Sequence, residues 1–118
     1  MRNFRKFEIW KLGIEIVKEV YSISLLLPKE EKFGLKSQIT RAAVSIPSNI
    51  AEGCSRSSDI EFKRFLEIAI GSLFELETQF VIIQELHFID TYKINAIIKL
   101  LNKEGKMINA LINKIKKS

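Results

Sequence analysis

The sequence has little of the residues that break or cross-link a chain. It contains one cysteine, Cys54, with two prolines and five glycines in 118 residues. A lone cysteine excludes an intramolecular disulfide, which fits a reducing, cytoplasmic location. Few turn-forming residues argue against a sheet fold, because sheets need a turn about every 8 to 12 residues. No run of about 18 uncharged apolar residues is present, so we expect no membrane span. The basic amino end leads into charged residues, which excludes a signal peptide as well.

What the sequence does have is apolar residues at helical spacing. They make up 47% of the chain and recur at alternating steps of four and three, which indicates one buried face on each of four helices. Short links make sequential helices antiparallel. We therefore predict an all-α, up-down four-helix bundle in a single domain, residues 1–118, with helices at about 7–26, 32–54, 58–87 and 91–116.

Local signals set the expected helix ends. Pro28 ends the first helix, Pro47 should kink the second, Ser58 and Glu61 form a capping box at the start of the third, and Asp90 caps the fourth. The predicted core stripe of the fourth helix is Ile94, Ile98, Leu101, Gly105, Ile108, Ile112 and Ile115.

Two helices carry more apolar surface than one core needs. A second row lies beside the main stripe of the fourth helix and another beside that of the first, and either row could thicken the core or form a subunit interface. The interface is the favoured interpretation, because large exposed apolar patches are seldom unused. The second rows are Ile97, Leu100, Met107 and Leu111, and Trp10, Ile14, Val17 and Tyr21.

Polar residues follow one face of the second helix, and a second polar set follows one face of the third. We expect the two sets to lie opposite each other. In an antiparallel hairpin, Arg41 falls level with Gly71 and can reach Glu67 or Glu75. We interpret the set as a structural polar network that fixes helix register, with acid–base catalysis as the weaker alternative. Its members are Arg41, Ser45, Asn49, Glu52, Glu67, Ser72, Glu75 and Gln79.

Positive charge gathers in the last quarter of the chain. Residues 1–92 carry 12 Lys or Arg and 13 Asp or Glu, whereas residues 93–118 carry seven Lys and only Glu104. On a helical wheel, five lysines fall in an arc of roughly 80°. They form either a solvated surface or a phosphate-binding face, to which the basic amino end adds its charge. The candidate nucleic-acid-binding residues are Lys99, Lys103, Lys106, Lys114, Lys117, Arg2, Arg5 and Lys6.

The sequence supports no catalytic, metal or cofactor site. Cys54 has no base near it in sequence. Together with His87, the only histidine, it supplies two zinc ligands where three or four are needed. No glycine-rich phosphate loop is present.

Two long stretches are familiar. Residues 37–53, SQITRAAVSIPSNIAEG, and residues 65–79, FLEIAIGSLFELETQ, resemble the signatures of the bacterial four-helix bundle proteins named after 23S rRNA intervening sequences, and the opening FEIW of residues 7–10 is similar to their usual beginning. Thr40 stands where relatives often have a second arginine, which weakens any charge contribution from the second helix. Cys54 stands where an aromatic residue is common, which suggests a looser turn.

The resemblance implies a ring-like homo-oligomer, usually a pentamer, without enzymatic activity or cofactor. The fold is also similar to that of accessory proteins of diversity-generating retroelements, which are basic pentamers associated with nucleic acid. We therefore expect a homo-oligomeric scaffold that binds RNA, DNA or a nucleic-acid-processing partner. The alternative is a protein–protein interaction module without a nucleic-acid role.

Overall fold

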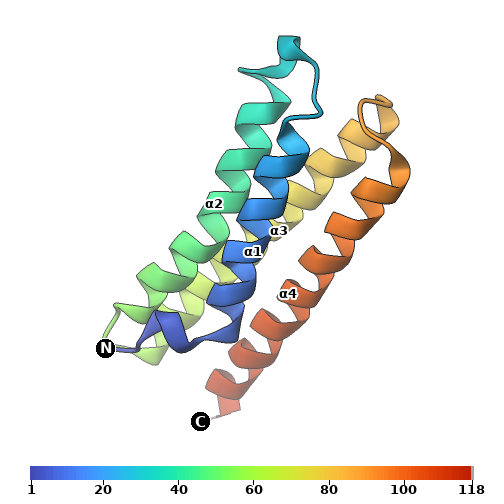
Figure 1. Ribbon diagram of the computed structural model, residues 1–118. Coiled ribbons are helices and arrows are strands. Elements are labelled where there is room, and N and C mark those ends of the chain that lie inside the picture. Colours follow the sequence, from blue (N-terminus) through green and yellow to red (C-terminus); the bar gives the residue numbers. More distant parts are fainter. Residues whose placement is uncertain (118) are drawn as a thin grey trace.

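The computed structural model describes residues 1–117, and within them the chain forms helices and no strand. The four long helices are α1 (Glu8–Ser24), α2 (Leu35–Cys54), α3 (Asp59–Glu85) and α4 (Thr91–Lys117). Two short 3-10 helices, η1 (Phe4–Lys6) and η2 (Lys29–Glu31), precede α1 and α2. The helices run up and down in sequence order, with both chain ends at the same end of the bundle (Figure 1).

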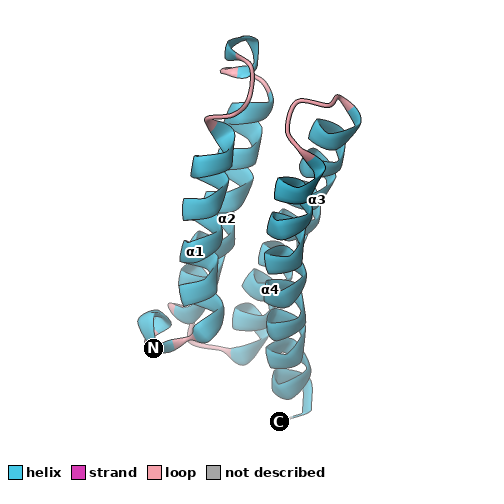
Figure 2. Cartoon of the chain, turned by 45° about the vertical axis from the view of Figure 1, so that its right-hand side comes forward, coloured by secondary structure: helices cyan, strands magenta, loops and turns pink. Residues whose placement is uncertain are grey.

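The bundle has a square cross-section. Each helix packs against its two neighbours, α1 on α2 and α4, and α3 on α2 and α4. Within residues 1–117, no Cα atom of a helix lies within 8 Å of one in the diagonally opposite helix. Figure 2 shows the α1–α2 hairpin on one side and the α3–α4 hairpin on the other. Among residues 1–117 no helix is both long and apolar enough to cross a membrane.

The helix ends follow local chemistry. The Ser58 hydroxyl oxygen accepts the Glu61 N–H at 3.1 Å, which is one half of the predicted capping box. At the other end of α3, Phe88 N–H bonds the Ile83 carbonyl and His87 N–H bonds that of Gln84, the two bonds of a Schellman motif. His87 therefore takes the left-handed conformation usually reserved for glycine, with φ of 58°.

The four–three spacing predicts core stripes in the other helices as well. Those of α1 and α3 are entirely buried, and that of α2 is buried apart from Leu35, which is half-buried. The α1 stripe is Ile9, Gly13, Ile16, Val20, Ile23 and Leu27, and the α3 stripe is Phe62, Leu66, Ala69, Leu73, Leu76, Phe80 and Ile83. The stripe of α4 was wrong in part. Ile97 and Glu104 are buried, while Ile98 and Gly105 are only half-buried. The buried face of α4 is therefore turned slightly from the expected one, toward Ile97 and Glu104, while Ile94, Leu101, Ile108 and Ile112 are buried as predicted. A carboxyl group consequently lies in the core.

The second apolar rows are largely covered within one chain. Tyr21 is exposed, Ile97 is buried, and the other members are half-buried. Leu100 and Met107 of the α4 row line the grooves toward α1. The α1 row turns toward α2, where Tyr21 lines a groove. The large exposed apolar side chains lie elsewhere, several on α3 and others where α1 ends and α2 begins. Besides Tyr21, they are Met1, Leu25, Leu26, Phe33, Val44, Ile60, Ile68, Phe74, Val81, Ile82, Leu86 and Tyr92.

Candidate nucleic-acid interface on helix α4

The five predicted lysines of α4 are all exposed. Its buried residues centre on the row through Leu101 and Ile108. On a wheel of about 100° per residue, Lys99 and Lys117 point directly away from that row. The basic face, defined here as Lys99, Lys103, Lys106, Lys114 and Lys117, therefore faces outward even after the register correction. No ion pair joins these lysines to an acid within residues 1–117.

The basic face meets acidic residues only at its edges. Lys103 borders a shallow groove between α1 and α4 that also includes Glu8 and Glu15. Lys106 borders the groove between α3 and α4, across from Glu77. Lys99 lines neither groove and forms no ion pair within residues 1–117.

Glu104 is the only acidic residue of α4, and it contributes no charge to the surface. It is fully buried, and neither carboxyl oxygen has a hydrogen-bond partner. Burial raises the pKa of Glu104 from 4.5 to about 8, because removing a carboxylate from water disfavours its charged form. The carboxyl group is therefore mainly protonated at pH 7, and the helix presents lysines without an ionised acid of its own.

Three helices make room for this carboxyl group. A β-carbon placed on Gly13 of α1 would lie 3.2 Å from Oε2 of Glu104 and 3.3 Å from Cβ of Pro47 in α2. A side chain at position 13 would therefore push both neighbours away by a few tenths of an ångström. Pro47 is buried at this crossing, and α2 continues through it as a helix. Pro47 also removes the backbone donor that the Ala43 carbonyl would otherwise receive.

Sequence reasoning missed Glu104 although a signal was present. Steps of three and four also run through Ile94, Ile97, Leu101, Glu104 and Ile108. Scoring only apolar residues hides this register, because its fourth member is charged.

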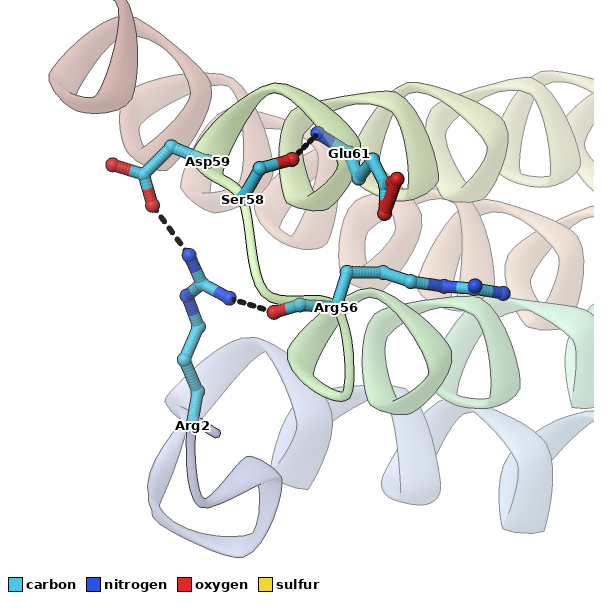
Figure 3. A network of polar contacts seen from close by, with 5 residues as sticks. All are labelled: Arg2, Arg56, Ser58, Asp59 and Glu61. Atoms are coloured by element: carbon cyan, nitrogen blue, oxygen red, sulfur yellow. Dashed lines mark hydrogen bonds and ion pairs between the residues drawn. The ribbon is translucent and has the colours of Figure 1, made fainter.

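The three basic residues at the amino end have different surroundings: Arg2 binds other parts of the chain, whereas Arg5 and Lys6 are exposed. Arg2 forms an ion pair with Asp59 and donates to the Arg56 carbonyl at 2.9 Å (Figure 3). Its guanidinium also lies 4.2 Å from the centre of the Phe62 ring. Its main-chain N–H bonds the Cys54 carbonyl at 3.2 Å. Arg2 therefore joins the start of the chain to the α2–α3 turn, and its charge is compensated.

Arg5 and Lys6 are exposed in η1, at the end of the bundle that also holds the end of α4 (Figure 1). The Arg5 guanidinium lies 5.6 Å from the Phe4 ring. Neither residue forms an ion pair in the described chain. They are the amino-terminal cations that remain free to extend the basic face.

The predicted polar set makes mostly local bonds. Ser45 donates to the Ala42 carbonyl, Asn49 to that of Ser45, and Ser72 to that of Ile68. Glu52 pairs with Arg56, and Glu67 pairs with Lys63.

Across the helices, the one side-chain hydrogen bond between α2 and α3 in residues 1–117 runs from Gln79 Nε2 to Gln38 Oε1, at 3.4 Å. Gln79 also donates to Glu75 at 3.4 Å. Arg41 is exposed, and its expected pairing with Glu67 or Glu75 is not among the ion pairs of the described residues.

The side chains that could act as a nucleophile or bind a metal do not form a site. Cys54 is buried, and burial raises the pKa of its thiol, an effect that the nearby positive charge of Arg2 partly opposes. A protonated, buried thiol is a poor nucleophile. No group of three or more metal-ligating side chains gathers anywhere in residues 1–117.

The comparisons place the fold in a known group. The chain is similar to a solved structure described as a protein of unknown function from the S23 ribosomal protein family of Bacteroides thetaiotaomicron, with 21% identity and a TM-score of 0.82. That likeness covers 88% of this chain and 97% of the other. No curated protein matches the chain. Residues 5–110 match the family described as 23S rRNA-intervening sequence protein. The chain therefore belongs to the 23S rRNA-intervening sequence protein family.

Proposed function

We propose that the chain is a non-enzymatic, homo-oligomeric scaffold that binds nucleic acid through the basic face of α4. The observation that carries the proposal is the withdrawal of Glu104 into the core, which leaves the outward lysines without an acid on the same helix. Repetition of the face around an oligomer would multiply its charge. Clustered cations without a counter-charge bind phosphate backbones by releasing condensed counterions.

The chemistry of the face sets the mode of binding. It contains lysine only, without the arginine forks or interleaved aromatic rings that read or stack bases. Binding should therefore depend on the phosphate backbone and not on base sequence. The name of the family refers to ribosomal RNA, so a structured RNA is the first ligand to test.

The test measures binding of labelled RNA, single-stranded DNA and duplex DNA across a salt series. Reversing Lys99, Lys103 and Lys114 to Glu should abolish binding at moderate salt. The milder change to Gln should lower the salt slope by about 2 to 3 for duplex, since each phosphate contact contributes about 0.9. Lys106 is kept because it borders the α3–α4 groove.

The matched control reverses Lys18, Lys29 and Arg64, three exposed cations outside α4, with the same change in net charge. If both triple reversals weaken binding equally, net charge and not the basic face is responsible. If the wild-type chain binds no nucleic acid even at low salt, the lysines are a solvated surface and the chain is a protein-interaction module.

A further inference from the structure

Two apolar patches on the surface carry opposite charge. The α1–α2 patch consists of Tyr21, Leu25, Lys32, Phe33 and Lys36, where α1 ends and α2 begins. The Phe33 side chain is 88% exposed and that of Leu25 74%. These residues line one groove together with Ser24, Ser37 and Thr40.

The second patch lies on the other hairpin. The α3–α4 patch consists of Phe74, Glu77, Val81 and Glu85, which follow one face of α3. Phe74 is 68% exposed and Val81 41%. Phe74 and Glu77 also line the groove between α3 and α4. Exposing aromatic side chains to water to this extent is unfavourable in free energy, and such side chains are typical of interaction sites.

The two patches lie at the same height of the bundle. The hydrogen bond between Gln79 and Gln38 fixes the level of α3 against α2. Residues 77–81 are therefore level with residues 36–40, beside Phe33. The patches also face opposite ways, because the square packing places the α1–α2 hairpin and the α3–α4 hairpin on opposite sides (Figure 2).

The charges of the patches are complementary. Lys32 and Lys36 are cations of the first patch, and Glu77 and Glu85 are anions of the second. None of the four forms an ion pair within residues 1–117. The nearby Glu31 already accepts the Leu35 N–H at 3.0 Å, so its carboxylate is turned toward the start of α2.

We infer that the α1–α2 patch of one copy binds the α3–α4 patch of the next, side by side and with the bundles parallel. This inference rests on the proposed homo-oligomeric function and names its interface. A second copy is the occupant because the chain itself carries both complementary surfaces at one height. Such a contact is heterologous, so repetition closes a ring when the rotation between neighbours completes a turn. Two patches of standard size would cover about a fifth of the 7219 Å² surface of one chain.

The experiment is a charge swap followed by sedimentation equilibrium. Lys32→Glu with Lys36→Glu gives two acidic patches, and Glu77→Lys with Glu85→Lys gives two basic ones. Each double variant should raise the dissociation constant of the oligomer about tenfold or more, because like charges then face each other. The quadruple variant restores opposite charges and should return to within about threefold of the wild type. Mixing the two double variants should also restore association, between unlike chains.

A second pair of variants tests the apolar contacts of the proposed interface. Phe33→Ser and Phe74→Ser remove exposed rings, so the folded chain should keep its helical circular dichroism while the oligomer dissociates. Lys99→Glu with Lys103→Glu is the control and should assemble as the wild type does.

The outcomes separate the two proposals. A wild-type chain that stays monomeric refutes the oligomeric scaffold and this interface together. An oligomer that is indifferent to both charge swaps and to both serine variants refutes the interface alone. Loss of nucleic-acid binding in an intact oligomer concerns only the basic face.

Discussion

The stability of the bundle should fall steeply between pH 4.5 and pH 8 because of Glu104. Below pH 4.5 the carboxyl group is protonated in both the folded and the unfolded chain. Between the two values the unfolded chain releases the proton while the folded chain keeps it, so rising pH favours unfolding. Above pH 8 the carboxyl group is ionised in both states, and all of the stability that its protonation supplied has been lost.

The size of this loss follows from the pKa. A rise from 4.5 to about 8 corresponds to about 5 kcal/mol of folding free energy, of which about 3 kcal/mol is already lost at pH 7. Domains of this size are stable by only about 5–15 kcal/mol. One side chain therefore removes a large share of the stability at neutral pH.

Replacing the carboxyl group should remove the pH dependence. Glu104→Met has a similar length without a titratable or polar group, and we expect it to be the most stable variant at pH 7 and 9. Glu104→Gln should show the same flat profile, at a stability lower by about 1–3 kcal/mol, because its buried amide lacks partners.

The assay is urea unfolding, followed by circular dichroism at 222 nm, at pH 5, 7 and 9 and one protein concentration. Glu19→Gln, an exposed change on α1, is the control and should keep the wild-type pH profile. The reasoning fails if wild type and Glu104→Met lose stability in parallel as pH rises. The carboxylate would then be ionised and hydrated within the folded chain.

Three further predictions concern local geometry. Gly53→Ala should lower the melting temperature, because the new β-carbon would lie 2.9 Å from Cβ of Phe65. Gly71→Ala meets no atom within 4 Å and should gain up to about 1 kcal/mol of helix propensity, so equal effects on thermal melting would contradict the packing argument. His87→Gly should stabilise by about 1 kcal/mol in urea unfolding by relieving a positive φ, and a loss would mean that the imidazole makes a compensating contact. Arg2→Ala should cost about 1 kcal/mol, from the lost carbonyl bond and ring contact, yet leave the salt slope of nucleic-acid binding unchanged; a lower slope would place Arg2 on the binding surface.

The helices were predictable because their signals are local. Proline, serine and the four–three spacing placed all four within three residues of their ends, and the stripes of α1 and α3 were identified completely. The outward direction of Lys99 and Lys117 was predictable for the same reason, because it depends only on the helical period.

Spacing alone allowed two registers for α4. Ile97 and Ile98 both belong to rows at steps of three and four, and the register found in the structure is the one that brings the Glu104 carboxyl group beside Gly13. The choice between the two rings of α3 was predictable, in contrast. The four–three steps of α3 run through Phe80, which is buried, and pass over Phe74, which is exposed.

The polar set shows a different limit. Serine and asparagine can bond the carbonyl groups of their own helix as readily as a partner across a helix pair. Ser45 and Asn49 donate to carbonyl groups of their own helix. The sequence contains both possibilities, and the choice between them depends on atomic distances that the residue order does not determine.

The anchoring of Arg2 has a consequence for how the chain is made. Its partner Asp59 lies 57 residues further along the chain, so the anchor cannot form until Asp59 has left the ribosome. The segment before α1 therefore emerges without its partner and waits for α2 and the turn after it. Translation order thus delays the fixing of Arg2 until two of the four long helices have been synthesised.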